Sequence, residues 1–195
     1  MKEKTELELM LWFTIGYLLL FSILAILSKN YEFLYYAFIL SALLLVIVLY
    51  HKKIHLTAHI LLGLSILGAL HVLGGNINIG VTRLYDLWLI QPNILKYDNV
   101  VHAFGIFVAT FVAYSFIHPH LDKKINHNPI LLSIILVSIA MGIGVFNEAL
   151  EFTSVLYLGA AAEVGDYFNN AIDLIYNLFG SIIACFVIIK YHKNK

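Results

Sequence analysis

Apolar residues gather along the chain into six long stretches, and shorter polar segments separate them. The first stretch, Leu9 to Ser28, runs for 20 residues without a charge. A transmembrane helix needs about 20 mainly apolar residues, so stretches of this length can cross a bilayer. The pattern therefore predicts six transmembrane helices, at about 9–27, 33–50, 55–73, 99–117, 130–156 and 170–190.

The composition indicates the same class of protein. Hydrophobic residues make up 61% of the 195 residues, and charged residues make up 12%, against about 25% charged in ordinary globular domains. Helices and closed barrels are the forms that satisfy their backbone polar groups within lipid. We expect an all-α, polytopic membrane protein, a six-transmembrane-helix bundle that forms a single domain. The net charge of zero gives no general attraction to nucleic acid.

The distribution of basic residues predicts the orientation in the membrane. Six spans place both termini on the same side. With the N-terminus in the cytoplasm, nine basic residues lie inside, and three lie outside: Lys29, Arg83 and Lys96. Cytoplasmic segments carry an excess of lysine and arginine. We therefore expect both termini in the cytoplasm and the protein in the plasma (inner) membrane.

The stretch 74–98 is too polar to span the bilayer and falls on the outer side. It contains Gly74-Gly75-Asn76 and Arg83, with an apolar patch around Trp88. We expect it to form a short interfacial helix or a re-entrant cap.

Polar residues at the outer ends of three predicted helices form the candidate site. Asp98 and His102 are four residues apart and share one helix face, as do Asp173 and Asn177. Small residues continue these faces inward and allow helices to approach closely. We expect a polar cup lined by Asp98, His102, Asn147, Glu148, Glu151, Asp173 and Asn177, with Arg83, Asp86, Glu163 and Asp166 closing over it. His71, at the outer end of the third predicted helix, is a further candidate member of the cup.

These residue types allow three kinds of chemistry. Carboxylates with an imidazole can hold one divalent metal ion, Mg, Mn, Zn or Fe, and helical bundles build such sites from residues three or four positions apart. The same groups could transfer protons as general acids and bases, or form a proton or cation path. A polar network that only fixes helix register is the structural alternative.

The leading hypothesis is an envelope enzyme that acts on a lipid or lipid-linked substrate. Its expected catalytic groups are His102, Glu148, Glu151 and Asp173. The same four residues and Asp98 are the candidate metal ligands. Its expected substrate contacts are Arg83, Asn147, Asp166 and Asn177. The alternatives are a transporter or proton relay, and a structural or partner-binding membrane protein.

Three motifs carry a family resemblance. The segment 97–104 (YDNVVHAF) is similar to the D-x-x-x-H helix opening of the YjdF-like inner-membrane proteins, the DUF2238 group, and of the related VanZ-like family. The segment 146–152 (FNEALEF) resembles their glutamate-bearing helix end. Gly165-Asp166 with 173–180 (DLIYNLFG) resembles their acidic loop and D-x-x-x-N-x-x-G motif. The resemblance implies a small polytopic membrane protein with a shared polar site, and, through the VanZ-like name, an association with glycopeptide resistance at the cell envelope. Neither name carries a reaction.

A second group of histidines lies on the cytoplasmic side. His51, His55 and His59 repeat every four residues at the start of the third predicted helix. Imidazoles can bind metals, but Lys52 and Lys53 would repel a cation. Contact with anionic lipid is the plainer interpretation.

Overall fold

The computed structural model describes residues 2–54, 56–90, 94–159 and 167–193. Within this part of the chain, six helices are long and apolar enough to cross a membrane. The prediction of an all-α polytopic membrane protein is therefore confirmed. The long helices are α1 (Lys2–Leu27), α2 (Tyr31–Tyr50), α3 (Ala58–Asn76), α4 (Tyr97–Ile117), α6 (Pro129–Leu158) and α8 (Tyr167–Lys193).

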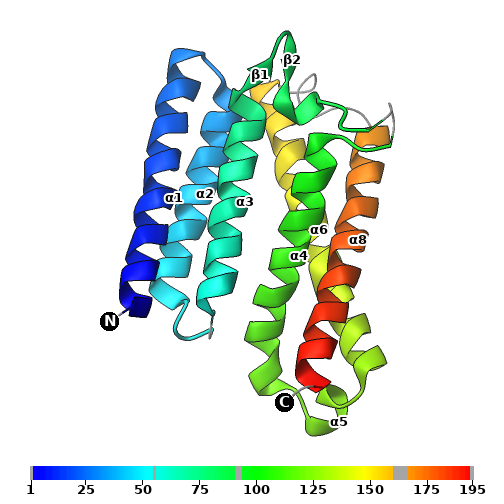
Figure 1. Ribbon diagram of the computed structural model, residues 1–195. Coiled ribbons are helices and arrows are strands. Elements are labelled where there is room, and N and C mark those ends of the chain that lie inside the picture. Colours follow the sequence, from blue (N-terminus) through cyan, green and yellow to red (C-terminus); the bar gives the residue numbers. More distant parts are fainter. Residues whose placement is uncertain (1, 55, 91–93, 160–166, 194–195) are drawn as a thin grey trace.

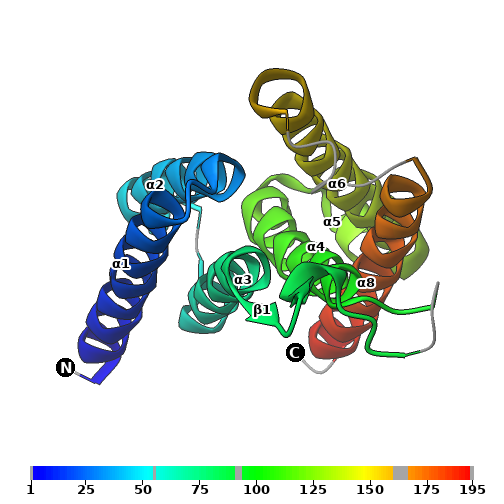
Figure 2. The same ribbon diagram turned by 90° about the horizontal axis from the view of Figure 1, so that it is seen from above.

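The six helices form two groups that lie side by side (Figures 1 and 2). Helices α1, α2 and α3 make one group, and α4, α6 and α8 make the other, with α3 packed against α4. Both termini lie at the same end of the bundle (Figure 1). We call this end the terminal end and the opposite end the hairpin end, because a small hairpin of β1 (Asn78–Ile79) and β2 (Thr82–Arg83) projects there.

Local signals in the sequence explain several helix boundaries. The side chain of Asn30 accepts a hydrogen bond from the Phe33 N–H and caps α2. Asn128 caps α6 in the same way, and Pro129 occupies the first position of that helix, where its missing N–H costs nothing. Gly159 ends α6 with a φ of 70°, a left-handed conformation that glycine adopts without steric penalty.

The segment between α3 and α4 differs from the prediction. Helix α3 continues to Asn76, so Gly74 and Gly75 are helical rather than part of the polar loop. Both glycines allow aromatic rings to approach, because a Cβ at Gly75 would overlap the Phe33 ring and one at Gly74 would overlap the Tyr85 ring. The described part of the segment then forms the hairpin and a three-residue 3-10 helix, η1 (Leu84–Asp86), instead of an interfacial helix or re-entrant cap.

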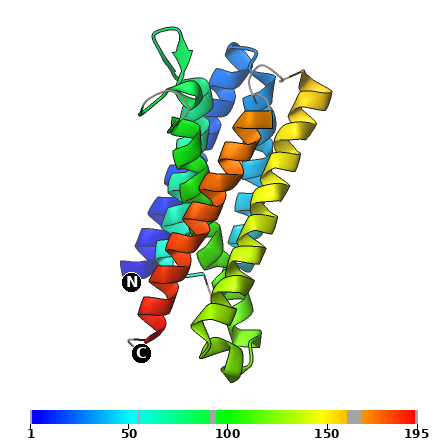
Figure 3. The ribbon, with the colours of Figure 1, turned by 90° about the vertical axis from the view of Figure 1, so that its right-hand side faces the viewer.

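Close packing of α4, α6 and α8 fixes the helices that carry the candidate site (Figure 3). Gly180 of α8 lies directly against the backbone of Ala103 in α4, where a Cβ would overlap the carbonyl oxygen. Toward the terminal end, a buried apolar cluster joins the three helices through Ala113, Leu132, Leu136, Cys185 and Ile188. At the terminal end, η2 (His118–His120) and α5 (Lys123–Asn126) connect α4 to α6.

Candidate functional site: an acidic cluster around His102

Five of the expected site residues come together near the hairpin end of α4, α6 and α8. These are Asp98 and His102 of α4, Glu148 and Glu151 of α6, and Asp173 of α8, which we call the acidic cluster. With a rise of 1.5 Å per residue, His102 lies about 8 Å and Asp173 about 9 Å from the starts of their helices. The acidic cluster is thus roughly two helical turns inside the hairpin end.

His102 lies at the centre of the acidic cluster. Its Nε2 is 3.4 Å from Asp98 Oδ1 and 3.7 Å from Glu151 Oε1, whereas its Nδ1 is 3.5 Å from Glu148 Oε1. The His102 side chain is 7% exposed, and the Glu148 side chain is 11% exposed. The imidazole therefore separates the carboxylates into two sets, with Asp98 and Glu151 at one nitrogen and Glu148 at the other.

Amide groups hold Asp173 in place. Its two carboxylate oxygens accept hydrogen bonds of 2.8 Å each, one from Asn99 Nδ2 and one from Asn169 Nδ2. Asn99 is itself fixed at the start of α4, because its Oδ1 accepts a bond from the Lys96 N–H at 2.8 Å. Asp173 is fully buried, so these amides replace the water that would otherwise solvate it.

Glu148 has no comparable support. Both of its carboxylate oxygens are buried and have no hydrogen-bond partner among the described residues. Glu151, one turn further along α6, accepts a bond from Asn147 Nδ2 at 2.7 Å. Glu148 Oε1 lies 3.5 Å from His102 Nδ1. A buried carboxylate without hydrogen bonds is costly unless it takes up a proton or a cation, so a bound cation or proton would stabilise Glu148.

Lys96 lies beside the acidic cluster. The sequence analysis used this lysine only to predict the orientation of the protein in the membrane. Its Nζ donates to Asn169 Oδ1 at 2.9 Å, and the other atom of that amide group donates to Asp173. The same Nζ lies 5.1 Å from the centre of the Trp88 ring. Four carboxylates against one lysine and one imidazole leave excess negative charge when all are ionised.

Arg83 forms ion pairs with two carboxylates at the hairpin end, and its expected contact with the substrate stays a prediction. Its Nη1 lies 3.3 Å from Glu32 Oε2, and its Nε lies 3.1 Å from Asp86 Oδ2. Glu32 belongs to α2 and is buried. Sequence reasoning missed this pairing because the two residues are 51 positions apart and lie in different polar segments.

Aromatic side chains from α2, α3 and η1 pack together beside the site. The Tyr85 hydroxyl lies 2.6 Å from His71 Nδ1, and the Tyr36 ring packs edge-on against the His71 ring. Burial, together with the nearby charges of Asp98 and Glu151, raises the pKa of Tyr85 well above its usual value. Tyr85 therefore remains protonated and can donate a hydrogen bond to His71.

Asn177, another expected site residue, lies beside the acidic cluster rather than in it. Asn177 lies one turn below Asp173 on α8, where its buried amide contacts Gly144 of α6. Neither atom of that amide group has a hydrogen-bond partner among the described residues. Asp166, like Glu163 in the same loop and His55 in the cytoplasmic series, lies outside the described residues.

The spacing of donor atoms in the acidic cluster matches that of a metal site. Two sets of three ligand atoms lie within 4.8 Å of one another: Asp98, His102 and Asp173, and His102, Glu148 and Glu151. Ligand atoms about 2.1 Å from a shared tetrahedral ion are about 3.4 Å apart. The separations of 3.4 and 3.7 Å around His102 Nε2 are close to that value.

A comparison with known families matches nearly the whole chain. The family model described as "Predicted membrane protein (DUF2238)" covers residues 9–194. No curated protein and no solved structure matches the chain.

Proposed function

The chain belongs to the DUF2238 family of predicted membrane proteins, and we propose that its acidic cluster binds one divalent metal ion and acts on a lipid or lipid-linked substrate. The observation that carries this proposal is the buried excess of carboxylates around His102, where Glu148 Oε1 lies 3.5 Å from Nδ1 and neither Glu148 oxygen has a hydrogen bond among the described residues. A divalent cation would neutralise that charge and supply the missing contacts.

The geometry assigns different roles to the carboxylates. Two sets of donor atoms share His102 and lie close enough together to hold one ion: Glu148 with Glu151, and Asp98 with Asp173. We assign the ion to His102, Glu148 and Glu151, because this set includes the Glu148 oxygens that lack hydrogen bonds among the described residues. Asp98 faces Nε2 of His102, where a carboxylate would fix the orientation of the metal-binding ring. Carboxylate oxygens with a single imidazole suit Mn, Mg, Zn or Fe.

A bound divalent ion would polarise an ester or phosphoryl oxygen of the substrate. The residues of the chain would bind the substrate and move its protons. Lys96 lies at the outer side of the acidic cluster and can contact an anionic headgroup. A carboxylate outside the set of metal ligands, Asp98 or Asp173, would accept a proton from the attacking group and return it to the leaving group.

The location proposed for this chemistry is the outer face of the plasma membrane. Among the described residues, eight of the nine basic residues expected inside belong to the terminal end and its connections, so the positive-inside bias supports an outer position for the hairpin end. Helix α6 is about 45 Å long, longer than the hydrocarbon core of about 30 Å. Its acidic residues, in the last third of the helix, can therefore lie near the headgroups of the outer leaflet.

Metal content of the purified full-length chain tests the proposal. After dialysis against Mn²⁺ or Zn²⁺ and removal of free metal, elemental analysis should find about one ion per wild-type chain. The Glu148→Gln and His102→Gln variants should lose most of it, because each removes a ligand or the group that orients one. The matched control is Asp86→Asn, a carboxylate at the same end that pairs with Arg83.

Two outcomes would support the alternatives instead. A folded wild-type protein that retains no divalent metal would favour a structural polar network. Transport of protons or cations in proteoliposomes that depends on Glu148 would favour a relay. The deeper part of α6 does not favour a relay, because its described residues Leu132, Leu136 and Ala140 are buried and apolar.

A further inference from the structure

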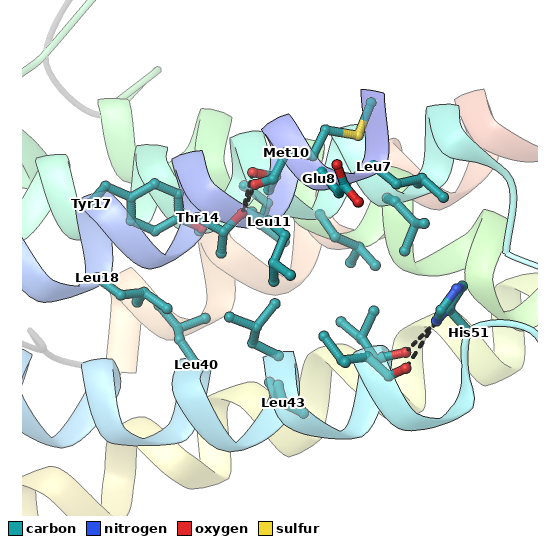
Figure 4. A pocket seen from close by; sticks show the side chains of 18 of the residues that line it. Leu7, Glu8, Met10, Leu11, Thr14, Tyr17, Leu18, Leu40, Leu43 and His51 are labelled. Carbon is teal, nitrogen blue, oxygen red and sulfur yellow. Dashed lines mark hydrogen bonds between the residues drawn. The ribbon is translucent and has the colours of Figure 1, made fainter. Parts of the chain in front are cut away.

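A cavity lies far from the acidic cluster, between α1, α2 and α3 in the half of the bundle toward the terminal end. It has a volume of about 390 Å³. Figure 4 shows leucine side chains of α1 and α2 facing one another across it, with Leu11 opposite Leu43. Pockets of this size hold small organic ligands or part of a larger one.

Packing explains why the helices separate at this level. Toward the hairpin end, α1 and α3 meet in a buried cluster of Leu18, Phe21 and Val72, against which Leu40 and Leu44 of α2 pack. Toward the terminal end, α2 carries outward-facing side chains such as Leu45 and Leu49, which are more than half exposed. The three helices thus remain in contact at one end and leave an apolar space at the other.

The polar groups in the cavity wall form hydrogen bonds with their neighbours. Thr14 Oγ1 donates to the Met10 carbonyl at 2.8 Å and lies 2.6 Å from Ser65 Oγ. The Tyr17 hydroxyl lies over Gly68, where a Cβ would overlap it. A buried water needs two to four polar partners, and these paired hydroxyls do not form a polar site for one.

The part of the cavity between the leucine side chains therefore favours an apolar group. In a bilayer, the surrounding medium is the acyl chains of lipids, which are as apolar as leucine side chains. An acyl chain in the cavity restores the dispersion contacts that an empty space would lose. Between Lys4 and Leu18, helix α1 rises about 21 Å, so the cavity is long enough along α1 to hold an acyl chain.

The mouth of the cavity carries basic groups. Lys4, Lys52 and His51 line it together with one acidic residue, Glu8. Lys4 is 84% exposed and lies 3.8 Å from Glu8 Oε1, a loose surface pair that contributes little. The Nδ1 of His51 contacts the carbonyl oxygens of Ile47 and Val48, which fixes the ring at the opening (Figure 4).

We propose that this cavity is a binding site for one phospholipid with an anionic headgroup, whose acyl chain lies between α1, α2 and α3. Its phosphate lies at the mouth, near Lys4, Lys52 and His51. The tail alone gives no selectivity over bulk lipid, so the basic groups decide which lipid binds. The site lies at the terminal end and does not depend on the chemistry of the acidic cluster.

Native mass spectrometry of the full-length chain tests the proposal. The protein is stripped of lipid in detergent and titrated with phosphatidylglycerol or with phosphatidylcholine of the same acyl chains. We expect one phosphatidylglycerol to bind at least tenfold more tightly than phosphatidylcholine. The double variant Lys4→Gln/Lys52→Gln should remove that preference. Lys53→Gln is the matched control, because Lys53 stacks over Tyr50 and does not line the cavity.

A second variant tests the tail. Leu64→Trp places an indole ring in the cavity and should abolish retention of both lipids, whereas Leu49→Trp, on the lipid-facing side of α2, should retain it. Size-exclusion profiles identify variants that have not folded, and the lysine variants alter exposed side chains that folding does not require. Equal affinity for both lipids, unchanged preference in the double lysine variant, or binding of glycerol phosphate as tight as that of the lipid would overturn the proposal.

Discussion

The carboxylates of the acidic cluster differ in how many hydrogen bonds they accept. Asp173 has both oxygens bonded to amides, whereas Glu148 has neither oxygen bonded among the described residues. The same chemical group therefore has two physical roles within one cluster. The sequence predicted that Asp98 and His102 would share a face, because that relation depends on helical spacing alone. It could not predict the amide bonds of Asp173, which depend on how α4 and α8 pack.

Replacing Arg83 tests whether it stabilises the fold or binds substrate. The Arg83→Met variant leaves Glu32 buried without its partner, and loss of one member of a buried ion pair costs about 3 kcal/mol. We expect a lower melting temperature in detergent with unchanged metal content. Adding Glu32→Gln should restore much of the stability. Loss of substrate binding with unchanged stability would instead support the role first expected for Arg83.

Replacing Lys96 tests the contact with an anionic substrate headgroup. In Lys96→Met, the charge beside Asn169 is lost while the ligands in the acidic cluster remain. A hydrogen bond to a charged group contributes about 1.5–3 kcal/mol, so affinity for an anionic lipid at the site should fall about tenfold or more. Lys29→Gln, at the same end of the bundle, is the control. Unchanged affinity in Lys96→Met would exclude the proposed headgroup contact.

Helices carried the strongest signal in the sequence. Six apolar runs predicted six spans, because the thickness of the bilayer sets a minimum helix length. The boundaries were less accurate: α1 begins at Lys2 rather than near residue 9, and α3 includes Gly74 and Gly75. Those glycines suggested a loop, but here they provide room for aromatic rings, a role that depends on tertiary contacts.

A single methyl group should disturb the helix pair that carries the acidic cluster. In Gly180→Ala, the new Cβ meets the Ala103 backbone, which cannot move as a flexible side chain can. Overpacking of this kind costs about 1–3 kcal/mol, and separation of α4 from α8 would also weaken the Asn99–Asp173 bond. Thermal unfolding and metal affinity should both decline.

The matched control for Gly180 is another helical glycine. A Cβ added at Gly142 of α6 would meet no atom of the surrounding structure within 4 Å, so Gly142→Ala should preserve stability or raise it slightly through better helix propensity. Equal effects of the two substitutions would contradict close packing of α4 on α8.

At the scale of the whole molecule, the structure separates two sites. The acidic cluster lies near the hairpin end between α4, α6 and α8, and the apolar cavity lies toward the terminal end between α1, α2 and α3. The sequence indicated the first site through ionisable residues within apolar runs. It carried no signal for the second, because a cavity between helices arises from how they diverge and not from any motif.

Cysteine labelling tests the proposed orientation. In a Cys185→Ser background, Val81→Cys places a thiol at the fully exposed tip of the hairpin, and Asp122→Cys places one at the terminal end beside α5. A membrane-impermeant maleimide should label position 81 in intact cells and position 122 only after permeabilisation. The reverse pattern would put the acidic cluster on the cytoplasmic side.

The most direct test of metal binding is pulsed electron paramagnetic resonance of the chain loaded with Mn²⁺. If the ion lies in the acidic cluster, its spectrum should show electron spin-echo modulation from one imidazole nitrogen. The modulation should disappear in His102→Gln and persist in His71→Gln, since His71 faces Tyr85. A spectrum of bound Mn²⁺ with no nitrogen modulation, or modulation that survives His102→Gln, would contradict a metal site centred on His102.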